Sequence, residues 1–262
     1  MDRGRTVAVI PARYGSTRFP GKPLALLHGT PMVAHVVARA REAGCFDEVL
    51  VATDDGRVAD AARSAGALPV ITGEARTGTD RVAQAVRNRD AAIVVNVQGD
   101  EPALPPESLR RLVAWLREHA ETPIATLALP CDEGDLGNPT VVKVVTDLGG
   151  RAMYFSRSAV PFPRNPKPDV HRKHVGLYGF QRDALFAFTS LPESELEAVE
   201  GLEQLRALVN GIAIQVLDAA GESVAVDVPD DVPRAEAAIA KLCSGVRGPG
   251  SGTGHEVPGT RR

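Results

Sequence analysis

Short apolar runs alternate with amphipathic patterns over the first half of the chain. Runs rich in Val, Ile and Ala predict buried strands at 6–12, 48–54, 67–71 and 91–97. Apolar residues recur at helical spacing in the intervening or following segments 31–44, 57–65, 80–87 and 106–119. Strands that alternate with helices of this length are typical of right-handed βαβ units. We therefore predict an α/β fold with a mostly parallel sheet and helices on both faces.

The second half of the chain has a different pattern. Short strands are predicted at 124–130, 140–146, 151–155 and 174–180, without long helices between them. They indicate a smaller antiparallel lobe, in which the proline-rich and charged segment 161–173 is either a mobile lid or a linker. The last elements expected are a helix at 194–211, strands at 212–218 and 224–227, and a helix at 229–242.

These patterns divide the chain into three parts. We expect a core formed by 1–130 and 212–242, a smaller lobe formed by 131–211, and a tail at 243–262. From Ser244 onward the tail holds six glycines and two prolines but no apolar cluster. Such a segment buries too little apolar surface to order itself, so the tail is predicted to be disordered.

Composition narrows the classes of function. The 262 residues, 44% of them hydrophobic, can bury a sizeable core, and the net charge of −3 offers no general surface for nucleic acid. Cys45, Cys131 and Cys243 have neither metal-ligand nor disulfide spacing, which is typical of a reducing compartment. No run reaches the ~20 apolar residues of a membrane span. We therefore expect a cytoplasmic protein with no membrane partner.

The loop PARYGSTRFPGKP (11–23) directly follows the first predicted strand. It is not a P-loop, because five residues separate Gly15 from Gly21 and Pro23 follows Lys22 where Ser or Thr is required. Nor does it have the dinucleotide-binding glycine spacing. Its cations, Arg13, Arg18 and Lys22, stand beside the small residues Gly15, Ser16 and Gly21. Such a loop is either a solvated basic turn or an anion site, and its place after a parallel strand favours the anion site.

Two aspartates follow apolar segments. Asp100 comes after the run at 91–97, and Asp227 stands just before Pro229 in SVAVDVPDD. Near a triphosphate such carboxylates hold Mg²⁺, whereas alone they are also good turn residues. Asp230 and Asp231 are better explained as caps of the last helix. Whether Asp100 and Asp227 meet is left open by their distance along the chain.

Nine strings taken together resemble the 3-deoxy-manno-octulosonate (KDO) cytidylyltransferases, also called CMP-KDO synthetases. They stand in family order over most of residues 6–242: IPARYGSTRFPGKPL (10–24), VATDD (51–55), TGTDR (77–81), VNVQGDEP (95–102), NPTVVKVV (138–145), YFSRSAVP (154–161), HVGLYGF (174–180), LEQLR (202–206) and VDVPDD (226–231). The resemblance implies the Rossmann-like nucleotide-diphospho-sugar transferase fold. It also implies a homodimer formed through the lobe. A role in lipopolysaccharide biosynthesis is implied as well, although the residues by themselves leave the pathway open.

The resemblance implies a CTP site in the core. Arg13 and Lys22 would bind the triphosphate and act in catalysis together with Asp100, with Ser16 and Arg18 of the same loop assisting. Thr79 and Arg81 would form part of the wall around CTP. Asp100 and Asp227 would be ligands for one or two Mg²⁺ ions.

The same resemblance implies an acceptor-sugar site at the lobe. Its residues would be Gln98, Arg157, Arg164, His174, Tyr178 and Glu203, with Gln204 beside them. Arg157 and Arg164 are suited to the sugar carboxylate, although both could equally be surface residues, and His174 could be a core histidine. Glu197, Glu200 and Glu203 share one helical face, so two of them are expected to be solvated.

The sequence departs from the family pattern at three points, of which the last two lie on the acceptor side. Val228 replaces a common threonine, Gln181 replaces a common arginine, and the loop between Arg164 and His174 is shorter than in several members. These two departures leave the identity of the acceptor open. Another acidic acceptor, such as phosphonoformate or a sialic-acid-type sugar, remains an alternative, as does a catalytically silent nucleotide-binding regulator. A dehydrogenase is excluded by the missing dinucleotide fingerprint.

Overall fold

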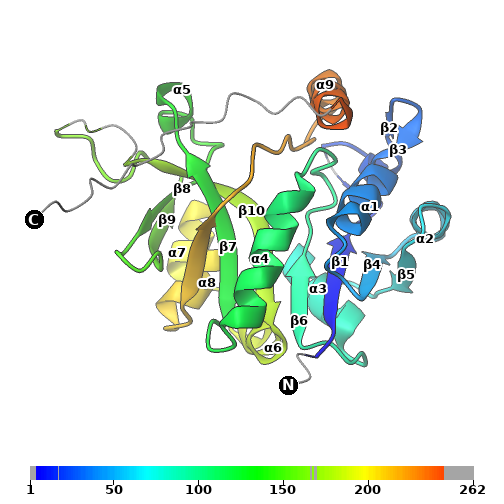
Figure 1. Cartoon of the computed structure of the whole chain (residues 1–262), viewed down its shortest axis with the longest axis horizontal. Helices are drawn as coiled ribbons and strands as arrows, with labels where there is room; N and C mark the ends of the chain where they lie inside the picture. The colour runs from blue at the N-terminus through cyan, green and yellow to red at the C-terminus, as the bar shows by residue number, and fades with distance from the viewer. Residues whose placement is uncertain (1–3, 17, 166, 168–169, 245–262) are drawn as a thin grey trace, which may run out of the picture.

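The computed structural model describes residues 4–16, 18–165, 167 and 170–244. Within these ranges a nine-stranded sheet runs through the molecule in the order β11-β7-β10-β6-β1-β4-β5, with β8 paired to β10 and β9 paired to β8 (Figure 1). Its strands are β1 (Thr6–Pro11), β4 (Glu48–Thr53), β5 (Leu68–Ile71), β6 (Ile93–Asn96), β7 (Ile124–Pro130), β8 (Lys143–Thr146), β9 (Ala152–Ser156), β10 (Arg172–Gln181) and β11 (Ile214–Asp218). A separate hairpin joins β2 (Leu26–Leu27) to β3 (Thr30–Pro31).

The sheet is mostly parallel, as predicted. β1 pairs in parallel with β4 and β6, β4 with β5, and β7 with β11. β10 runs antiparallel between β6 and β7, and β8 and β9 extend the antiparallel part. The carboxyl ends of β1, β4 and β6 therefore lie at one edge, where ligands bind in sheets of this kind.

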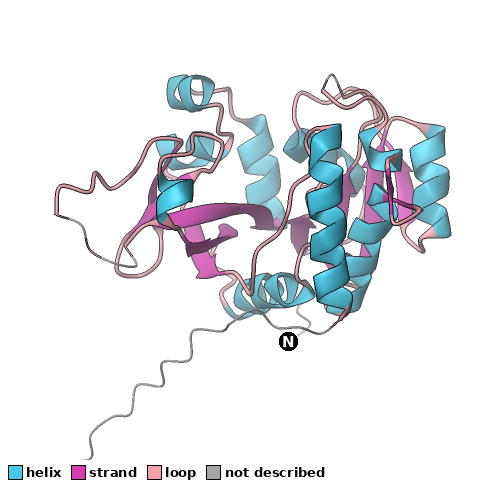
Figure 2. Cartoon of the chain, turned by 90° about the horizontal axis from the view of Figure 1, so that it is seen from above, coloured by secondary structure: helices cyan, strands magenta, loops and turns pink. Residues whose placement is uncertain are grey.

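Helices cover both faces of the sheet, because successive strand residues point to opposite sides (Figure 2). Ala8 and Ile10 of β1 pack in one core cluster, and Val7 and Val9 pack in another. The first cluster includes α1 (Met32–Ala43), α2 (Gly56–Ser64) and α4 (Pro106–Glu118); the second includes α3 (Gly78–Val86), α6 (Arg182–Ser190) and α8 (Gln204–Val209). The remaining helices are α5 (Glu133–Leu136), α7 (Glu195–Glu200), α9 (Val232–Cys243) and two 3₁₀ turns, η1 (Lys22–Leu24) and η2 (Pro229–Asp231).

The single helix predicted at 194–211 is wrong. The chain forms α7, leaves it at Gly201 in a left-handed conformation with φ of 62°, and begins again at α8. The prediction that two of Glu197, Glu200 and Glu203 are solvated is wrong too. Glu197 is buried in an ion pair with Arg206, and Glu200 accepts hydrogen bonds from the Ser156 hydroxyl and the Arg157 amide.

Two other local predictions also fail. Residues 224–227 form no strand and contribute one backbone bond to the core, from Val226 N–H to the Asp100 carbonyl at 2.9 Å. The helix α6 was not predicted, because its apolar residues directly follow those of β10 and the two patterns merge.

The division into a core and a lobe remains a prediction. The segment assigned to the lobe includes β10, which lies in the middle of the main sheet between β6 and β7. Of the tail predicted at 243–262, Cys243 belongs to α9, and residues 245–262 lie outside the described residues. None of the helices in the described ranges is long and apolar enough to span a membrane.

Candidate active site

The loop after β1 is folded back on Tyr14. The Tyr14 carbonyl accepts hydrogen bonds from the N–H groups of Ser16 and Gly21, each at 3.1 Å. Gly21 has a φ of 72°, and a Cβ there would stand 3.2 Å from the Tyr14 hydroxyl oxygen. Gly21 thus allows the turn that leads into η1, whose first residue is Lys22.

Lys22 lies between the two predicted metal ligands. Its Nζ donates to Asp100 Oδ2 at 2.7 Å and to Asp227 Oδ1 at 3.4 Å, while Arg18 donates to the same Asp227 oxygen at 3.0 Å. Asp100 and Asp227 therefore converge, which the sequence left open. The turn before Asp100 passes so close to β1 that a Cβ on Gly99 would stand 2.6 Å from the Pro11 carbonyl oxygen.

A polar cavity of about 400 Å³ opens beside this cluster. It is formed by the loops at the carboxyl edge of the sheet and by the start of α3. Its polar lining includes the predicted nucleotide residues Arg13, Ser16, Arg18, Lys22, Arg81, Asp100 and Asp227, together with Gln98, Arg76 and Glu203. We call it the phosphate cavity, because its cations are those that complement phosphate oxygens.

Arg81 is held rigidly in the wall of the phosphate cavity. Its side chain is 6% exposed, and its guanidinium donates to Asp54 Oδ2 at 3.0 Å and to the hydroxyl of Thr72. Asp54 also accepts from the Tyr14 amide at 3.2 Å, so one carboxylate links the first loop to α3. The sequence analysis missed Asp54, although it stands at the end of the second predicted strand (48–54), within the string VATDD, where ligand-binding residues are expected.

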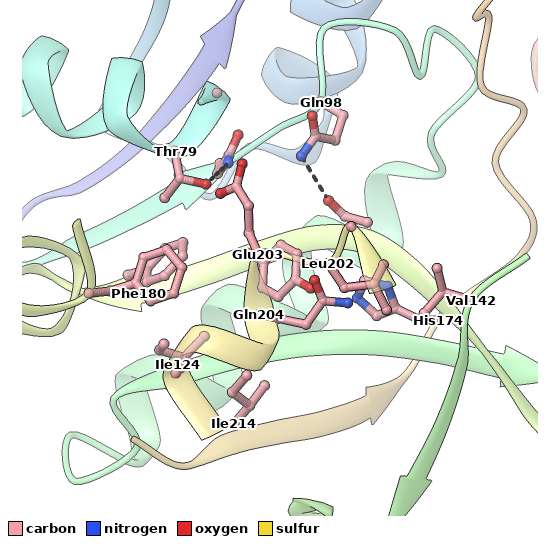
Figure 3. A pocket seen from close by; sticks show the side chains of 17 residues that line it. Thr79, Gln98, Ile124, Val142, His174, Phe180, Leu202, Glu203, Gln204 and Ile214 are labelled. Atoms are coloured by element: carbon pink, nitrogen blue, oxygen red, sulfur yellow. Dashed lines mark hydrogen bonds between the residues drawn. The ribbon is translucent and has the colours of Figure 1, made fainter. Parts of the chain in front are cut away.

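A second cavity of about 240 Å³ adjoins the first, and Gly78, Gln98 and Glu203 line both. Figure 3 shows polar side chains from α3, β10 and the α7–α8 connection around it, above an apolar floor that includes Ile124 and Ile214. Its polar lining comprises Thr79, Asn96, Gln98, His174, Tyr178, Glu203 and Gln204. Thr79 was predicted for the CTP wall, but it lines only this second cavity, which we call the acceptor cavity.

Burial keeps the side chains of His174 and Tyr178, which line the acceptor cavity, uncharged. It lowers the pKa of His174 to about 3. Burial, with the Glu203 carboxylate nearby, raises the pKa of Tyr178 well above its ordinary value. Burial also raises the pKa of Glu203, against hydrogen bonds from Thr79 and Thr77. The Tyr178 hydroxyl and Asn96 Oδ1 are buried without a hydrogen-bond partner among the described residues, which favours a polar ligand.

The structure does not bring Arg157 and Arg164 into either cavity. Arg157 donates to the carbonyl oxygens of Glu200 at 2.7 Å and Pro139 at 3.1 Å, so it ties β9 to the end of α7. Arg164 is exposed in the loop before β10. Neither side chain lines the two cavities.

Comparison with known proteins places the chain in a family. Residues 7–214 match the family model described as "Cytidylyltransferase". A 3-deoxy-manno-octulosonate cytidylyltransferase of Myxococcus xanthus is 50% identical over 240 residues, covering 90% of this chain and 97% of the relative. One of Anaeromyxobacter sp. (strain Fw109-5) is 49% identical over 239 residues, with the same coverage. The chain belongs to the KDO cytidylyltransferase family.

A solved structure supports the same placement. It is a CMP:2-keto-3-deoxy-manno-octonic acid synthetase complexed with CTP, 40% identical, with a TM-score of 0.87 over 91% of this chain and 99% of that one. The resemblance found in the nine strings is therefore confirmed. The chain is a cytidylyltransferase whose fold matches that of a CTP-bound relative.

Proposed function

We propose that the chain transfers CMP from CTP to KDO and releases pyrophosphate. The observation that supports this best is the pair of adjoining cavities, which share Gln98 and Glu203, with the Asp100–Lys22–Asp227 cluster lining the phosphate cavity. One cavity is lined by phosphate-binding cations and the other by neutral polar groups over an apolar floor. The relatives named above carry the acceptor in their names, and one binds CTP.

In the proposed reaction an acceptor hydroxyl attacks the α-phosphorus of CTP. A bond forms from this oxygen to phosphorus, the bond to the β-phosphate bridging oxygen breaks, and the hydroxyl proton is lost. Catalysis then requires alignment of the two substrates and neutralisation of charge on the phosphates. Lys22 and Arg13 are suited to neutralising the departing pyrophosphate, and Gln98 and Glu203 lie where the two substrates would meet.

Asp100 and Asp227 are the residues that would hold Mg²⁺. They fit this ion because both are carboxylates and both contact the single ammonium of Lys22, so their oxygens surround one cationic position. No group of three or more His, Cys, Asp or Glu residues within the described ranges could hold a metal ion, so phosphate oxygens would complete the coordination. When bound, Mg²⁺ would withdraw charge from the phosphates and acidify the attacking hydroxyl.

For the acceptor, the roles of His174, Tyr178, Glu203 and Gln98 as sugar-binding residues are supported by their place in one cavity. Binding of the sugar carboxylate by Arg157 and Arg164 remains a proposal, because both side chains lie outside that cavity. The similar proteins give no support to phosphonoformate, to a sialic acid or to a silent regulator.

A panel of acceptors tests the proposal. Pyrophosphate release with CTP and Mg²⁺ should require KDO and should not occur with sialic acid or phosphonoformate. Asp100→Ala and Asp227→Asn should each remove most of the turnover, while Asp230→Asn, which alters an exposed aspartate in the same turn, should leave turnover unchanged. Turnover with another acceptor alone would refute the sugar assignment, and near-normal activity of Asp100→Ala would refute the metal assignment.

We further propose a homodimer formed through the lobe. Large apolar side chains are exposed there in the β8–β9 turn, on β9, in the loop before β10 and on α7. They are Leu148, Met153, Phe162, Leu196 and Val199, each at least 45% exposed. A second copy of the chain would remove these side chains from water.

A further inference from the structure

We infer that Thr126 is a positioning residue: it holds His174 in the tautomer with the proton on Nε2, so that Nδ1 accepts a hydrogen bond from an acceptor hydroxyl. The statement about the tautomer stands on the free protein alone. The statement about the acceptor rests on the function proposed above.

The Thr126 hydroxyl has three possible hydrogen-bond partners but only one proton to donate. It lies in β7 and is fully buried. Its Oγ1 is 2.8 Å from the Leu177 carbonyl oxygen, 3.3 Å from the Val175 carbonyl oxygen and 2.9 Å from His174 Nε2. A hydroxyl donates one hydrogen bond and accepts up to two.

The carbonyl groups decide where the proton of Thr126 goes. A carbonyl oxygen can only accept, and a buried one without a donor is costly. The shift in register between Val175 and Tyr178 gathers both carbonyls around this one hydroxyl. If Thr126 donated to His174 instead, its lone pairs would face two carbonyl oxygens at 2.8 and 3.3 Å. Thr126 therefore donates to Leu177 and accepts from His174, which places the ring proton on Nε2.

The other ring nitrogen, Nδ1, has no hydrogen-bond partner among the described residues and is then an acceptor on the cavity side. His174 lines the acceptor cavity whereas Thr126 does not, so Nε2 is directed away from the ligand space. Burial lowers the pKa of His174 to about 3, so the ring stays neutral and Nδ1 keeps its lone pair. Figure 3 labels the ring among the side chains that line the cavity.

A fixed acceptor at this point selects the chemistry of the ligand. Nδ1 and the unpartnered Asn96 Oδ1 are acceptors, and the Tyr178 hydroxyl can donate or accept. A polyhydroxylated sugar can donate to both acceptors. In the other tautomer Nδ1 of His174 would carry the proton and face the cavity as a donor. It could then bind the same hydroxyl only if the hydroxyl donated its own proton to another group.

Nitrogen NMR of ¹⁵N-labelled protein reads the tautomer directly, because protonated and bare ring nitrogens resonate in separate regions. The spectrum of His174 is assigned by its loss in His174→Asn. We expect Nε2 protonated in the wild type and in Thr126→Ser, and a mixed or reversed tautomer in Thr126→Val. Thr6→Val is the matched control: it removes a buried threonine hydroxyl that accepts from Arg117, outside the cavity lining, and should leave His174 unchanged.

Steady-state kinetics tests the consequence for the acceptor. Thr126→Val should raise the KM for KDO roughly tenfold, the lower end of the range seen when a residue that orients a metal-bound histidine is lost, with the KM for CTP unchanged. Thr126→Ser should restore the KM for KDO.

Three results would overturn the inference. A bare Nε2 in the wild type would do so whatever the variants show, and so would an unchanged His174 tautomer in Thr126→Val. An altered tautomer with an unchanged KM for KDO would overturn the role toward the acceptor. A wild type that does not turn over KDO would instead count against the proposed function, and the NMR result on the free protein would keep the two failures apart.

Discussion

At the scale of single residues, Asp54 joins parts of the phosphate cavity that are separate in the sequence. It accepts from the Tyr14 amide in the first loop and pairs with the Arg81 guanidinium on α3. Breaking a buried pair leaves an uncompensated charge, although Asp54 is 42% exposed, so water replaces part of what is lost.

We expect Asp54→Asn to lower the free energy of unfolding by about 1–2 kcal/mol and to raise the KM for CTP. Urea unfolding and steady-state kinetics measure the two effects. Asp60→Asn is the control, because Asp60 pairs with Arg63 at an exposed position on α2 and should change neither quantity. An unchanged KM for CTP would show that Asp54 does not position the cavity.

His174 makes stability depend on pH. Burial lowers the pKa of His174 from 6.5 to about 3, so between these values the unfolded chain binds a proton that the folded protein does not. The stability present above pH 6.5 is therefore lost as the pH falls, by up to about 1.4 kcal/mol per pH unit inside this window.

The comparison with His174→Gln isolates this effect, because all other titrating groups are common to both proteins. We expect the difference in unfolding free energy, wild type minus variant, to fall steadily from pH 7 to pH 5. Urea unfolding at three pH values measures it. A difference that does not change with pH would contradict the buried, neutral histidine.

At the scale of elements, the break between α7 and α8 positions the acceptor cavity. Gly201 leaves the helix in the left-handed region, and the chain then presents Glu203 and Gln204 to the cavity. Sequence periodicity predicted one helix here because the apolar spacing continues across Gly201 and the cost of one glycine is small. Leu202 and Glu203 line the acceptor cavity, and these contacts stabilise the broken helix. Such tertiary contacts cannot be seen in a local sequence pattern.

We expect Gly201→Ala to destabilise the protein by about 1 kcal/mol, because an L-residue is strained at a φ of 62°. It should also raise the KM for KDO, since Glu203 follows two residues later. Gly137→Ala is the matched control at a helix C-cap with a φ of −81°, where an added Cβ would meet open space. Thermal unfolding of the two variants decides: equal stability would mean that the break tolerates a side chain.

At the scale of the whole molecule, the sheet was predictable and the site was predictable in part. Runs of β-branched residues and the residues that start and end helices are local signals, so the strands and helices predicted in 6–119 agree with the structure within a few residues. Only the short η1, β2 and β3 in this range were not predicted. The meeting of Asp100 with Asp227 depends on the chain's return across the sheet edge after β11, which no local pattern encodes. The same holds for β10, whose place between β6 and β7 is a matter of topology.

The proposed dimer is a prediction at this scale. Val199 is 84% exposed on α7, and a glutamate there would put a charge into an apolar interface. We expect the wild type to have the mass of two chains in light scattering and Val199→Glu to have the mass of one. A charge at Leu68, which is 51% exposed at the opposite edge on β5, should leave the mass unchanged. A monomeric wild type would refute the dimer.

The central claim is that the α-phosphate of CTP is transferred to KDO, and phosphorus NMR of the reaction mixture tests it most directly. With CTP, KDO and Mg²⁺ we predict that the three CTP resonances are replaced by pyrophosphate and one phosphodiester resonance in equal amounts, and that omission of KDO abolishes both. The appearance of CDP with inorganic phosphate, or an unchanged CTP spectrum in the complete mixture, would contradict the claim.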